Sequence, residues 1–196
     1  MPTAAILAGG RARRLGGRDK SQLVIGGRTI LDRQIDALRQ VVDRVVIVTS
    51  DPSRILTSRA PVVQDLVPDA GGLGGILTAL STGTDRVLVV ACDMPFVTAP
   101  FLAHVLEAGQ QADAAVPRDT GGYHPLCACY SQACAGPIRQ RVQAGALKVV
   151  DLFGDIRVRD IGPDEIAAYD PDGLLLLNIN TPDDLARAER GRDQSA

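Results

Sequence analysis

A glycine-rich loop near the start of the chain carries residue types that bind phosphate groups. It follows the apolar run of residues 3–7 and contains the pairs Gly9–Gly10 and Gly16–Gly17, several arginines including Arg14, and then Lys20. Glycines let backbone N–H groups approach phosphates closely, and several cations along one loop suit a triphosphate. The spacing matches neither the dinucleotide pattern G-x-G-x-x-G nor the P-loop. The loop therefore predicts a nucleoside triphosphate site, and the alternative is a solvated basic loop.

Lysine is rare in this chain, which makes its positions informative. Of the 21 basic residues, only Lys20 and Lys148 are lysines. The lysine ammonium group is a compact point charge, whereas the arginine guanidinium group is planar and wider. The two lysines are candidates for positions that a guanidinium group does not fit, and the alternative is that lysine stands there by chance. Lys148 follows a helix-like segment, where it can dock a second phosphate.

A single aspartate follows the most apolar run of the chain. Residues 86–91 read as a buried strand, and the sequence continues Cys92-Asp93-Met94-Pro95. Mg²⁺ accompanies nucleoside triphosphates, keeps several waters and takes one or two carboxylates from the protein. Asp93 at the end of a strand, beside a phosphate loop of the same sheet, predicts a Mg²⁺ ligand.

Three polar residues of the later half are candidates for binding an acceptor. His124 lies between Tyr123 and Pro125, and it has either a structural or an acceptor-binding role. Asn178 and Asn180 precede a helix with Thr181 as its N-cap, so they are either turn residues or contacts to the metal and acceptor.

Composition excludes several classes of function. The 196 residues have a formal net charge of -2 and 3% aromatic residues, which argues against a nucleic-acid partner. No apolar stretch approaches the roughly 20 residues of a membrane helix, and the N-terminus lacks the pattern of a signal peptide. The four cysteines lack the paired C-x-x-C spacing of a zinc site. We expect reduced, buried thiols in a cytoplasmic protein.

Strand and helix patterns alternate along the first part of the chain. Apolar runs at residues 3–7, 44–49 and 86–91 read as strands buried on both faces, and the stripe of Leu31, Ile35, Leu38 and Val42 reads as a helix. This pattern predicts a single-domain α/β fold, Rossmann-like and doubly wound, with a mostly parallel sheet. We expect one domain over residues 1–190, with a nucleotide-binding half to about 110, an acceptor half over 111–190 and a frayed tail at 191–196.

The chain resembles the bacterial molybdenum cofactor guanylyltransferases. The resemblance rests on residues 7–20, Cys92–Pro95, Tyr123–Leu126 and Asn178–Asp184, and it extends over nearly the whole chain. The first loop alone would indicate only the wider nucleotidyltransferase superfamily. The resemblance implies a nucleotidyltransferase fold that binds GTP and Mg²⁺ and transfers GMP to a molybdopterin-type acceptor, releasing pyrophosphate. It leaves open which molybdenum-insertion or molybdoenzyme-maturation proteins are partners.

The resemblance also assigns residues. Leu7, Ala8, Gly9, Gly10 and Lys20 match the nucleotide site of the family, Asp65 matches its nucleoside-contacting aspartate and Asp93 its magnesium ligand. The segment Gly71-Gly72-Leu73-Gly74-Gly75 stands where relatives more often have G-P-L-A-G, so a flexible loop is expected there, with Gly75 at the nucleotide. Relatives often have Asn at the position of Val48.

The implied chemistry needs no general base, because a phosphate monoester has a second pKa of about 6 and is mostly dianionic at neutral pH. Positioning and cationic stabilisation suffice, so Asp93 through Mg²⁺, Lys20 and Arg14 are the catalytic candidates. Three alternatives stay open: the same transfer from CTP, a sugar- or lipid-phosphate nucleotidyltransferase, and a non-catalytic nucleotide-binding adaptor. Two donors on the guanine edge facing a carboxylate such as Asp65 favour GTP over CTP.

Overall fold

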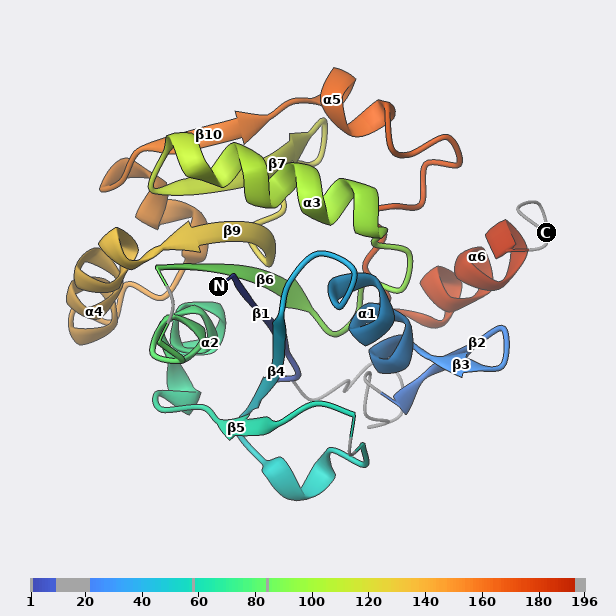
Figure 1. The fold of residues 1–196 in the computed structure, drawn as a ribbon, viewed down its shortest axis with the longest axis horizontal. Coiled ribbons are helices and arrows are strands. Elements are labelled where there is room, and N and C mark those ends of the chain that lie inside the picture. The colour runs from blue at the N-terminus through green and yellow to red at the C-terminus, as the bar shows by residue number, and fades with distance from the viewer. Residues whose placement is uncertain (1, 10–21, 58, 84, 193–196) are drawn as a thin grey trace.

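Strands with apolar residues on both faces build one mixed sheet (Figure 1). The structure, a computed structural model, describes residues 2–9, 22–57, 59–83 and 85–192. In β1, Ala4 and Ile6 belong to one hydrophobic cluster, and Ala5 and Leu7 belong to another. The strands of the sheet are β1 (Thr3–Leu7), β4 (Arg44–Thr49), β5 (Val62–Gln64), β6 (Arg86–Ala91), β7 (Ala114–Asp119), β8 (Gly122–Tyr123), β9 (Cys127–Ser131) and β10 (Val158–Ile161).

The sheet is mostly parallel. Its strands lie in the order β10-β7-β9-β6-β1-β4-β5, with β8 paired to β7. β1 is parallel to β4 and β6, β4 is parallel to β5, and β7 is parallel to β10. β9 runs antiparallel to both β6 and β7. The predicted α/β class with a mostly parallel sheet is therefore confirmed.

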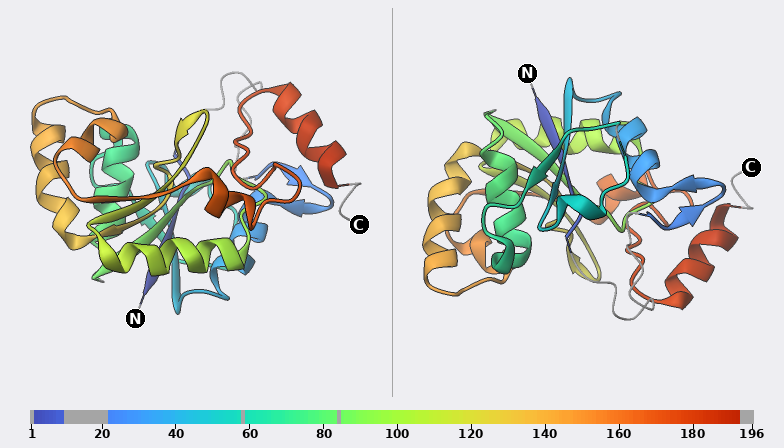
Figure 2. Two further views of the ribbon diagram at one scale, coloured as in Figure 1. Left: turned by 90° about the horizontal axis from the view of Figure 1, so that it is seen from above. Right: turned by 90° about the horizontal axis from the view of Figure 1, so that it is seen from below.

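Helices cover both faces of the sheet, as a doubly wound fold requires (Figure 2). Apolar side chains of α1, α3 and α5 pack in one cluster, and those of α2 and α4 pack in the other. The helices are α1 (Ile30–Leu38), α2 (Gly71–Leu80), α3 (Ala99–Ala108), α4 (Ala135–Gln143), α5 (Pro163–Ala167) and α6 (Pro182–Arg192). No helix in these described ranges is both long and apolar enough to span a membrane.

A small third cluster joins the two ends of the chain. It combines the hairpin of β2 (Val24–Ile25) and β3 (Arg28–Thr29) with residues around α6, and its buried members are Leu23, Ile25, Ile30, Ile179 and Ala188. The Thr181 Oγ atom accepts a hydrogen bond from Asp184 N–H at 3.2 Å, so the predicted N-cap of α6 is confirmed. The helix continues to Arg192, two residues beyond the predicted end of the domain at residue 190.

The segment Gly71–Gly75 corrects one expectation. It forms the first turns of α2 rather than a flexible loop. A Cβ atom on Gly75 would lie 2.9 Å from the Leu7 side chain, and one on Gly74 would lie 2.2 Å from the Val67 carbonyl oxygen. Both distances are too short for a side chain, so these glycines allow α2 to pack closely on β1 and on the preceding loop. Packing outweighs the low helix propensity of glycine here.

Candidate active site

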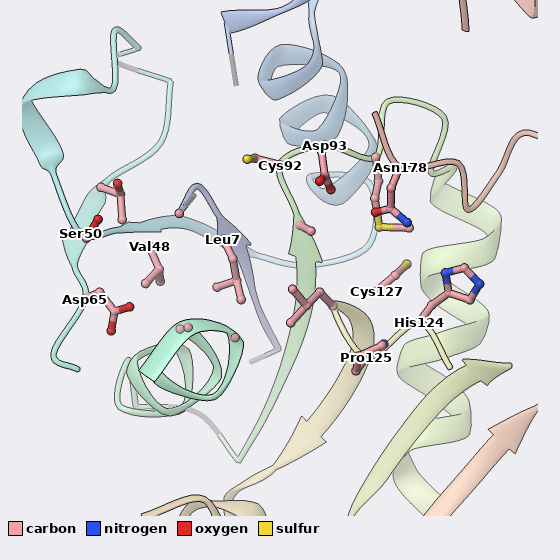
Figure 3. Close-up of a pocket in the computed structure, with 18 of the residues that line it drawn as sticks. Leu7, Val48, Ser50, Asp65, Cys92, Asp93, His124, Pro125, Cys127 and Asn178 are labelled. Carbon is pink, nitrogen blue, oxygen red and sulfur yellow. The ribbon is translucent and has the colours of Figure 1, made fainter. Parts of the chain in front are cut away.

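A pocket of about 490 Å³ lies at the edge of the sheet where β1, β4 and β6 end. Ligands of open α/β sheets bind at these carboxyl ends. Figure 3 shows Val48, Ser50 and Asp65 at one end of the pocket and His124 and Asn178 at the other. The lining residues are Leu7, Gly9, Val48, Thr49, Ser50, Asp65, Pro68, Gly71, Gly72, Gly75, Ala91, Cys92, Asp93, Met94, Tyr123, His124, Pro125, Leu126, Cys127 and Asn178.

The end of β1 is held between its two neighbouring strands. Ala8 N–H donates to the Val48 carbonyl at 2.8 Å, and Cys92 N–H donates to the Leu7 carbonyl at 3.1 Å. Leu7 and Gly9 line the pocket, whereas Ala8 does not. The remaining candidates of the glycine-rich loop, namely Gly10, Arg14 and Lys20, lie outside the described residues.

Hydrogen bonds to its carboxylate hold the side chain of Asp65 in place. The Thr78 hydroxyl donates to Asp65 Oδ1 at 2.7 Å, and Val67 N–H donates to the same oxygen at 3.0 Å. Thr78 is fully buried on α2 and also accepts from Leu66 N–H at 3.0 Å. Within the described part of the chain Oδ2 has no hydrogen-bond partner, so this oxygen is the one that can accept from a ligand.

Asp93 is positioned through its main chain. It lies in the turn after β6, and its carbonyl accepts from Ile179 N–H at 2.9 Å. This bond places the turn beside Asn178, which lines the same pocket (Figure 3). Asn178 Nδ2 donates to the Leu176 carbonyl at 3.3 Å, which leaves the amide oxygen as its possible ligand atom.

The donor set around Asp93 fits Mg²⁺. The described ranges contain no group of three or more His, Cys, Asp or Glu side chains that could hold a metal ion. Mg²⁺ takes few protein ligands and completes its shell with water and substrate phosphates. One carboxylate and one amide oxygen that line the pocket satisfy that requirement.

His124 is paired with a carboxylate that the sequence did not single out. Its Nε2 atom lies 2.8 Å from Asp119 Oδ2, and Gly121 N–H donates to Asp119 Oδ1 at 2.7 Å. Burial raises the pKa of Asp119, but the hydrogen bonds from His124 and Gly121 outweigh it, so the pKa lies below its ordinary value. Asp119 therefore stays ionised and orients the imidazole. The sequence signal that could have revealed this pair is the D-x-x-x-x-H spacing around a turn.

Two further acceptor candidates lie away from the pocket. Lys148 is not among its lining residues; its side chain is 74% exposed and its Nζ atom is 4.0 Å from Asp151 Oδ1. Asn180 is exposed, and its N–H donates to Asp184 Oδ2 at 2.9 Å. This hydrogen bond of the main chain belongs to the start of α6, and the acceptor-binding role of the Asn180 side chain stays a prediction.

The cysteines are free and buried, as predicted. Cys92 and Cys127 line the pocket. Burial raises the pKa of Cys127 to about 12, so this thiol stays protonated at neutral pH. A protonated thiol is a poor nucleophile, and Cys127 contributes packing to the pocket wall.

Comparison with known proteins agrees with this arrangement. Residues 4–155 match the family model of the MobA-like NTP transferase domain. The chain is 35% identical over 189 residues to the molybdenum cofactor guanylyltransferase of Desulfosudis oleivorans, covering 95% of this chain and 94% of that protein. Molybdopterin-guanine dinucleotide biosynthesis protein A from Archaeoglobus fulgidus superposes with a TM-score of 0.86 at 28% identity, covering 99% of this chain and 100% of that chain.

A more distant protein shares only the fold. The 2-C-methyl-D-erythritol 4-phosphate cytidylyltransferase of Thermus thermophilus has a TM-score of 0.70 at 19% identity, covering 96% of this chain and 98% of that chain. The family match and the full-length relatives thus identify an α/β nucleotidyltransferase, with a pocket at the carboxyl ends of β1, β4 and β6. Within that class, the chain belongs to the MobA-like NTP transferase family, among the molybdenum cofactor guanylyltransferases.

Proposed function

We propose that this enzyme transfers GMP from GTP to a molybdenum–molybdopterin cofactor, forming the guanine dinucleotide cofactor and pyrophosphate. The observation that carries the proposal is one continuous pocket with Asp65 at one end, His124 at the other and Asp93 among its lining residues. A nucleotide and a phosphorylated acceptor need such a shared space. Similarity over nearly the full length to guanylyltransferases supports the choice of substrates.

The nucleotide occupies the end of the pocket near β1, β4 and α2. Leu7, Gly9 and Gly75 line this end, Gly9 leaves space for the nucleotide to approach the backbone, and Oδ2 of Asp65 accepts from the base. Ala8, Gly10 and Lys20 belong to the same site on the strength of the family resemblance. The side chain of Val48 is apolar, so it supplies only packing there.

Asp93 and Asn178 would hold Mg²⁺ in the pocket that they line. Bound there, the ion supplies neutralisation of triphosphate charge. Lys20 and Arg14 are assigned the same electrostatic task on the α-phosphate.

The acceptor occupies the end near His124. An oxygen of its dianionic phosphate forms a new bond to the α-phosphorus, the bond to the bridging oxygen of the β-phosphate breaks, and pyrophosphate leaves. No proton has to be removed from the nucleophile. The imidazole of His124, oriented by Asp119, binds the acceptor and takes no part in proton transfer.

A turnover assay tests this proposal. The purified protein is incubated with Mg²⁺, the molybdenum cofactor and each of GTP, CTP, ATP and UTP, and pyrophosphate and the dinucleotide product are measured. We expect turnover with GTP that depends on the acceptor. Preference for CTP would make the protein a cytidylyltransferase, and turnover only with sugar or lipid phosphates would change the acceptor class. Nucleotide binding without pyrophosphate release would make it an adaptor.

A further inference from the structure

A polar side chain lies on the apolar buried face of α1. Gln34 is fully buried, like Leu31, Ile35 and Leu38, which share this face of the helix. A glutamine is costly to bury unless its amide is hydrogen-bonded. Its partners therefore indicate why it is there.

Both partners of Gln34 belong to the turn that carries Asp93. The Gln34 Nε2 atom donates to the Ala91 carbonyl at 2.7 Å and to the Met94 carbonyl at 2.9 Å. Both acceptors are carbonyl oxygens, so only the amino end of the side chain can face them. One amide group thus spans the turn across Cys92 and Asp93.

The oxygen end of the Gln34 amide does not stabilise the folded state. Within the described ranges, its buried Oε1 atom has no hydrogen-bond partner. An unsatisfied buried acceptor destabilises the folded state, whereas an apolar residue at this position would extend the stripe of Leu31 and Leu38. Packing of α1 therefore does not explain a glutamine at this position.

The hydrogen bonds of the turn leave its main chain little freedom. Gln34 binds the carbonyls of Ala91 and Met94, and Ile179 N–H binds the carbonyl of Asp93 at 2.9 Å. Cys92 N–H binds the Leu7 carbonyl at 3.1 Å. The turn is thereby joined to α1, to β1 and to the segment that contains Asn178.

We propose that Gln34 is a positioning residue that fixes the Ala91–Met94 turn so that Asp93 meets the metal–nucleotide complex. This inference rests on the proposed function, in which Asp93 binds Mg²⁺. Gln34 touches neither substrate nor metal; it acts through the backbone on either side of the ligand. Loss of its two hydrogen bonds lets the turn relax, and a displacement of about 1 Å costs about 100-fold in rate.

The test uses Gln34→Met, which keeps the length of the side chain and removes its donors. We expect kcat to fall about 10- to 100-fold and the half-activating Mg²⁺ concentration to rise about 10-fold, the order reported for groups that orient metal ligands. Calorimetric titration of GTP with and without Mg²⁺ gives a readout independent of turnover. The variant should bind metal-free GTP like the wild type and lose most of the additional affinity that Mg²⁺ confers.

Two control variants separate positioning from stability. Gln40→Met makes the same chemical change at an exposed glutamine beyond the end of α1, whose Nε2 donates to the Asp36 carbonyl at 3.0 Å, and it should behave like the wild type. Ile35→Val weakens the packing of α1 and leaves both hydrogen bonds of Gln34 in place, and it should lower the melting temperature without changing the Mg²⁺ response.

The outcomes distinguish the two proposals. If Gln34→Met kept the Mg²⁺ response and kcat of the wild type, or if Ile35→Val lost them equally, Gln34 would be only structural. If wild-type protein gained no affinity for GTP from Mg²⁺, or kept the gain in Asp93→Asn, the metal assignment of the proposed function would fail instead.

Discussion

The two aspartates of the pocket are supported by different sets of hydrogen bonds. Asp65 is fixed by its carboxylate, since Oδ1 accepts from the Thr78 hydroxyl and from Val67 N–H. Asp93 is fixed by its main chain, since its carbonyl is bound by Ile179 N–H and the carbonyls on either side are bound by Gln34. A carboxylate held at one oxygen presents the other in a set direction, which suits the donors of a base. A main chain held by hydrogen bonds fixes the position from which the carboxylate side chain extends, which suits a metal ion that also has water and phosphate ligands.

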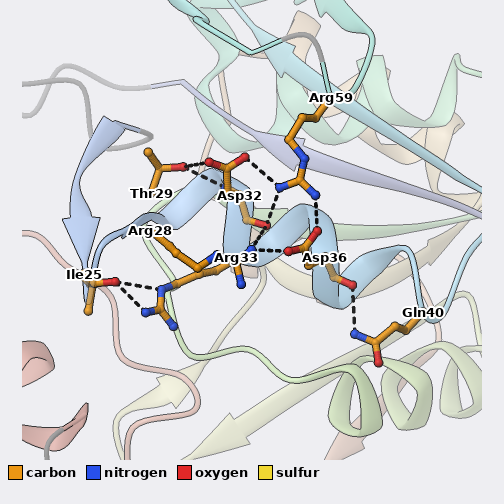
Figure 4. A network of polar contacts seen from close by, with 8 residues as sticks. All are labelled: Ile25, Arg28, Thr29, Asp32, Arg33, Asp36, Gln40 and Arg59. Atoms are coloured by element: carbon orange, nitrogen blue, oxygen red, sulfur yellow. Dashed lines mark hydrogen bonds and ion pairs between the residues drawn. The ribbon is translucent and has the colours of Figure 1, made fainter.

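A third group of carboxylates shows what a purely structural arrangement looks like. On the outer face of α1, Asp32 and Asp36 both pair with Arg59, and Asp36 also pairs with Arg28 (Figure 4). The Thr29 hydroxyl caps the helix and donates to Asp32 at 2.8 Å. These carboxylates are satisfied by guanidinium groups and line no part of the pocket, so they join α1 to the segment before β5.

Loss of the Asp93 charge should have the largest effect. Asp93→Asn keeps the shape of the side chain and the backbone hydrogen bonds of the turn, but weakens a metal ligand. A loss of several kcal/mol of charge stabilisation corresponds to a decrease in kcat on the order of 1,000-fold. Steady-state turnover in Mg²⁺ measures the loss, and an unchanged melting temperature controls for folding. Turnover near the wild-type rate would mean that Asp93 is not the metal ligand.

Loss of the Thr78 hydroxyl should affect nucleotide binding rather than chemistry. Thr78→Val removes the donor to Asp65 Oδ1 and the acceptor of Leu66 N–H. A hydrogen bond to a charged group is worth about 1.5–3 kcal/mol, so KM for GTP should rise about 10-fold or more while kcat changes little. Thr78→Ser retains the hydroxyl and is the matched control. Equal KM values for the valine and serine variants would show that Asp65 does not need this support.

The acceptor end of the pocket should respond separately from both aspartates. His124→Ala should raise KM for the molybdopterin acceptor about 10-fold, the size of one lost charge-assisted contact, and leave the affinity for GTP unchanged. Asp119→Asn should give a smaller change in the same constant, since it disturbs only the orientation of the imidazole. A loss of GTP affinity in either variant would place His124 at the nucleotide end.

The ion pairs on α1 should give the smallest effect, confined to stability. Arg59 holds the pKa values of Asp32 and Asp36 below their ordinary value of 3.8. Stability from carboxylates with depressed pKa values is present above about pH 4 and is lost as the pH falls through the folded-state values. These side chains are partly exposed, so solvent screening limits the effect of Arg59→Ala to a melting temperature lower by roughly 1–3 °C at neutral pH, with unchanged turnover.

Melting curves between pH 7 and pH 2 check the sign of this effect. The difference between the wild type and Arg59→Ala should shrink towards acidic pH. Arg44→Ala is the control, because Arg44 donates to the carbonyl of Thr82 rather than to a carboxylate, and its difference should not follow the same titration. A difference for Arg59→Ala that is constant with pH would contradict the ion-pair account.

The sequence predicts those features that depend on residues close together in the chain. The continuous apolar runs of β1 and β6 predict strands buried on both faces and hence the doubly wound sheet, and Asp93 is singled out because it follows an apolar strand. Gly71–Gly75 was expected to be a flexible loop, whereas in the fold it begins α2, and Gly75 packs closely against Leu7, which is far away in the sequence. Local patterns lose their predictive value where a distant contact decides.

Supporting residues were missed for the same reason. Thr78 reads as an ordinary helix residue, and its hydrogen bond to Asp65 exists only once α2 packs against the segment that follows β5. Gln34 lies 57 residues before Ala91 in the sequence, and only the fold brings the two residues together. The roles of Lys20 and Arg14 stay predictions from the glycine-rich loop.

The division of labour between Asp65 and Asp93 is tested most directly by one set of titrations. Binding of GTP and CTP is measured with and without Mg²⁺ for the wild type, Asp65→Asn and Asp93→Asn. We predict that Asp65→Asn reduces the preference for GTP over CTP about 10-fold or more and keeps the gain in affinity from Mg²⁺, while Asp93→Asn keeps the preference and loses the gain. If both variants changed the same quantity, or if each changed the quantity assigned to the other, the two aspartates would not have the separate roles described here.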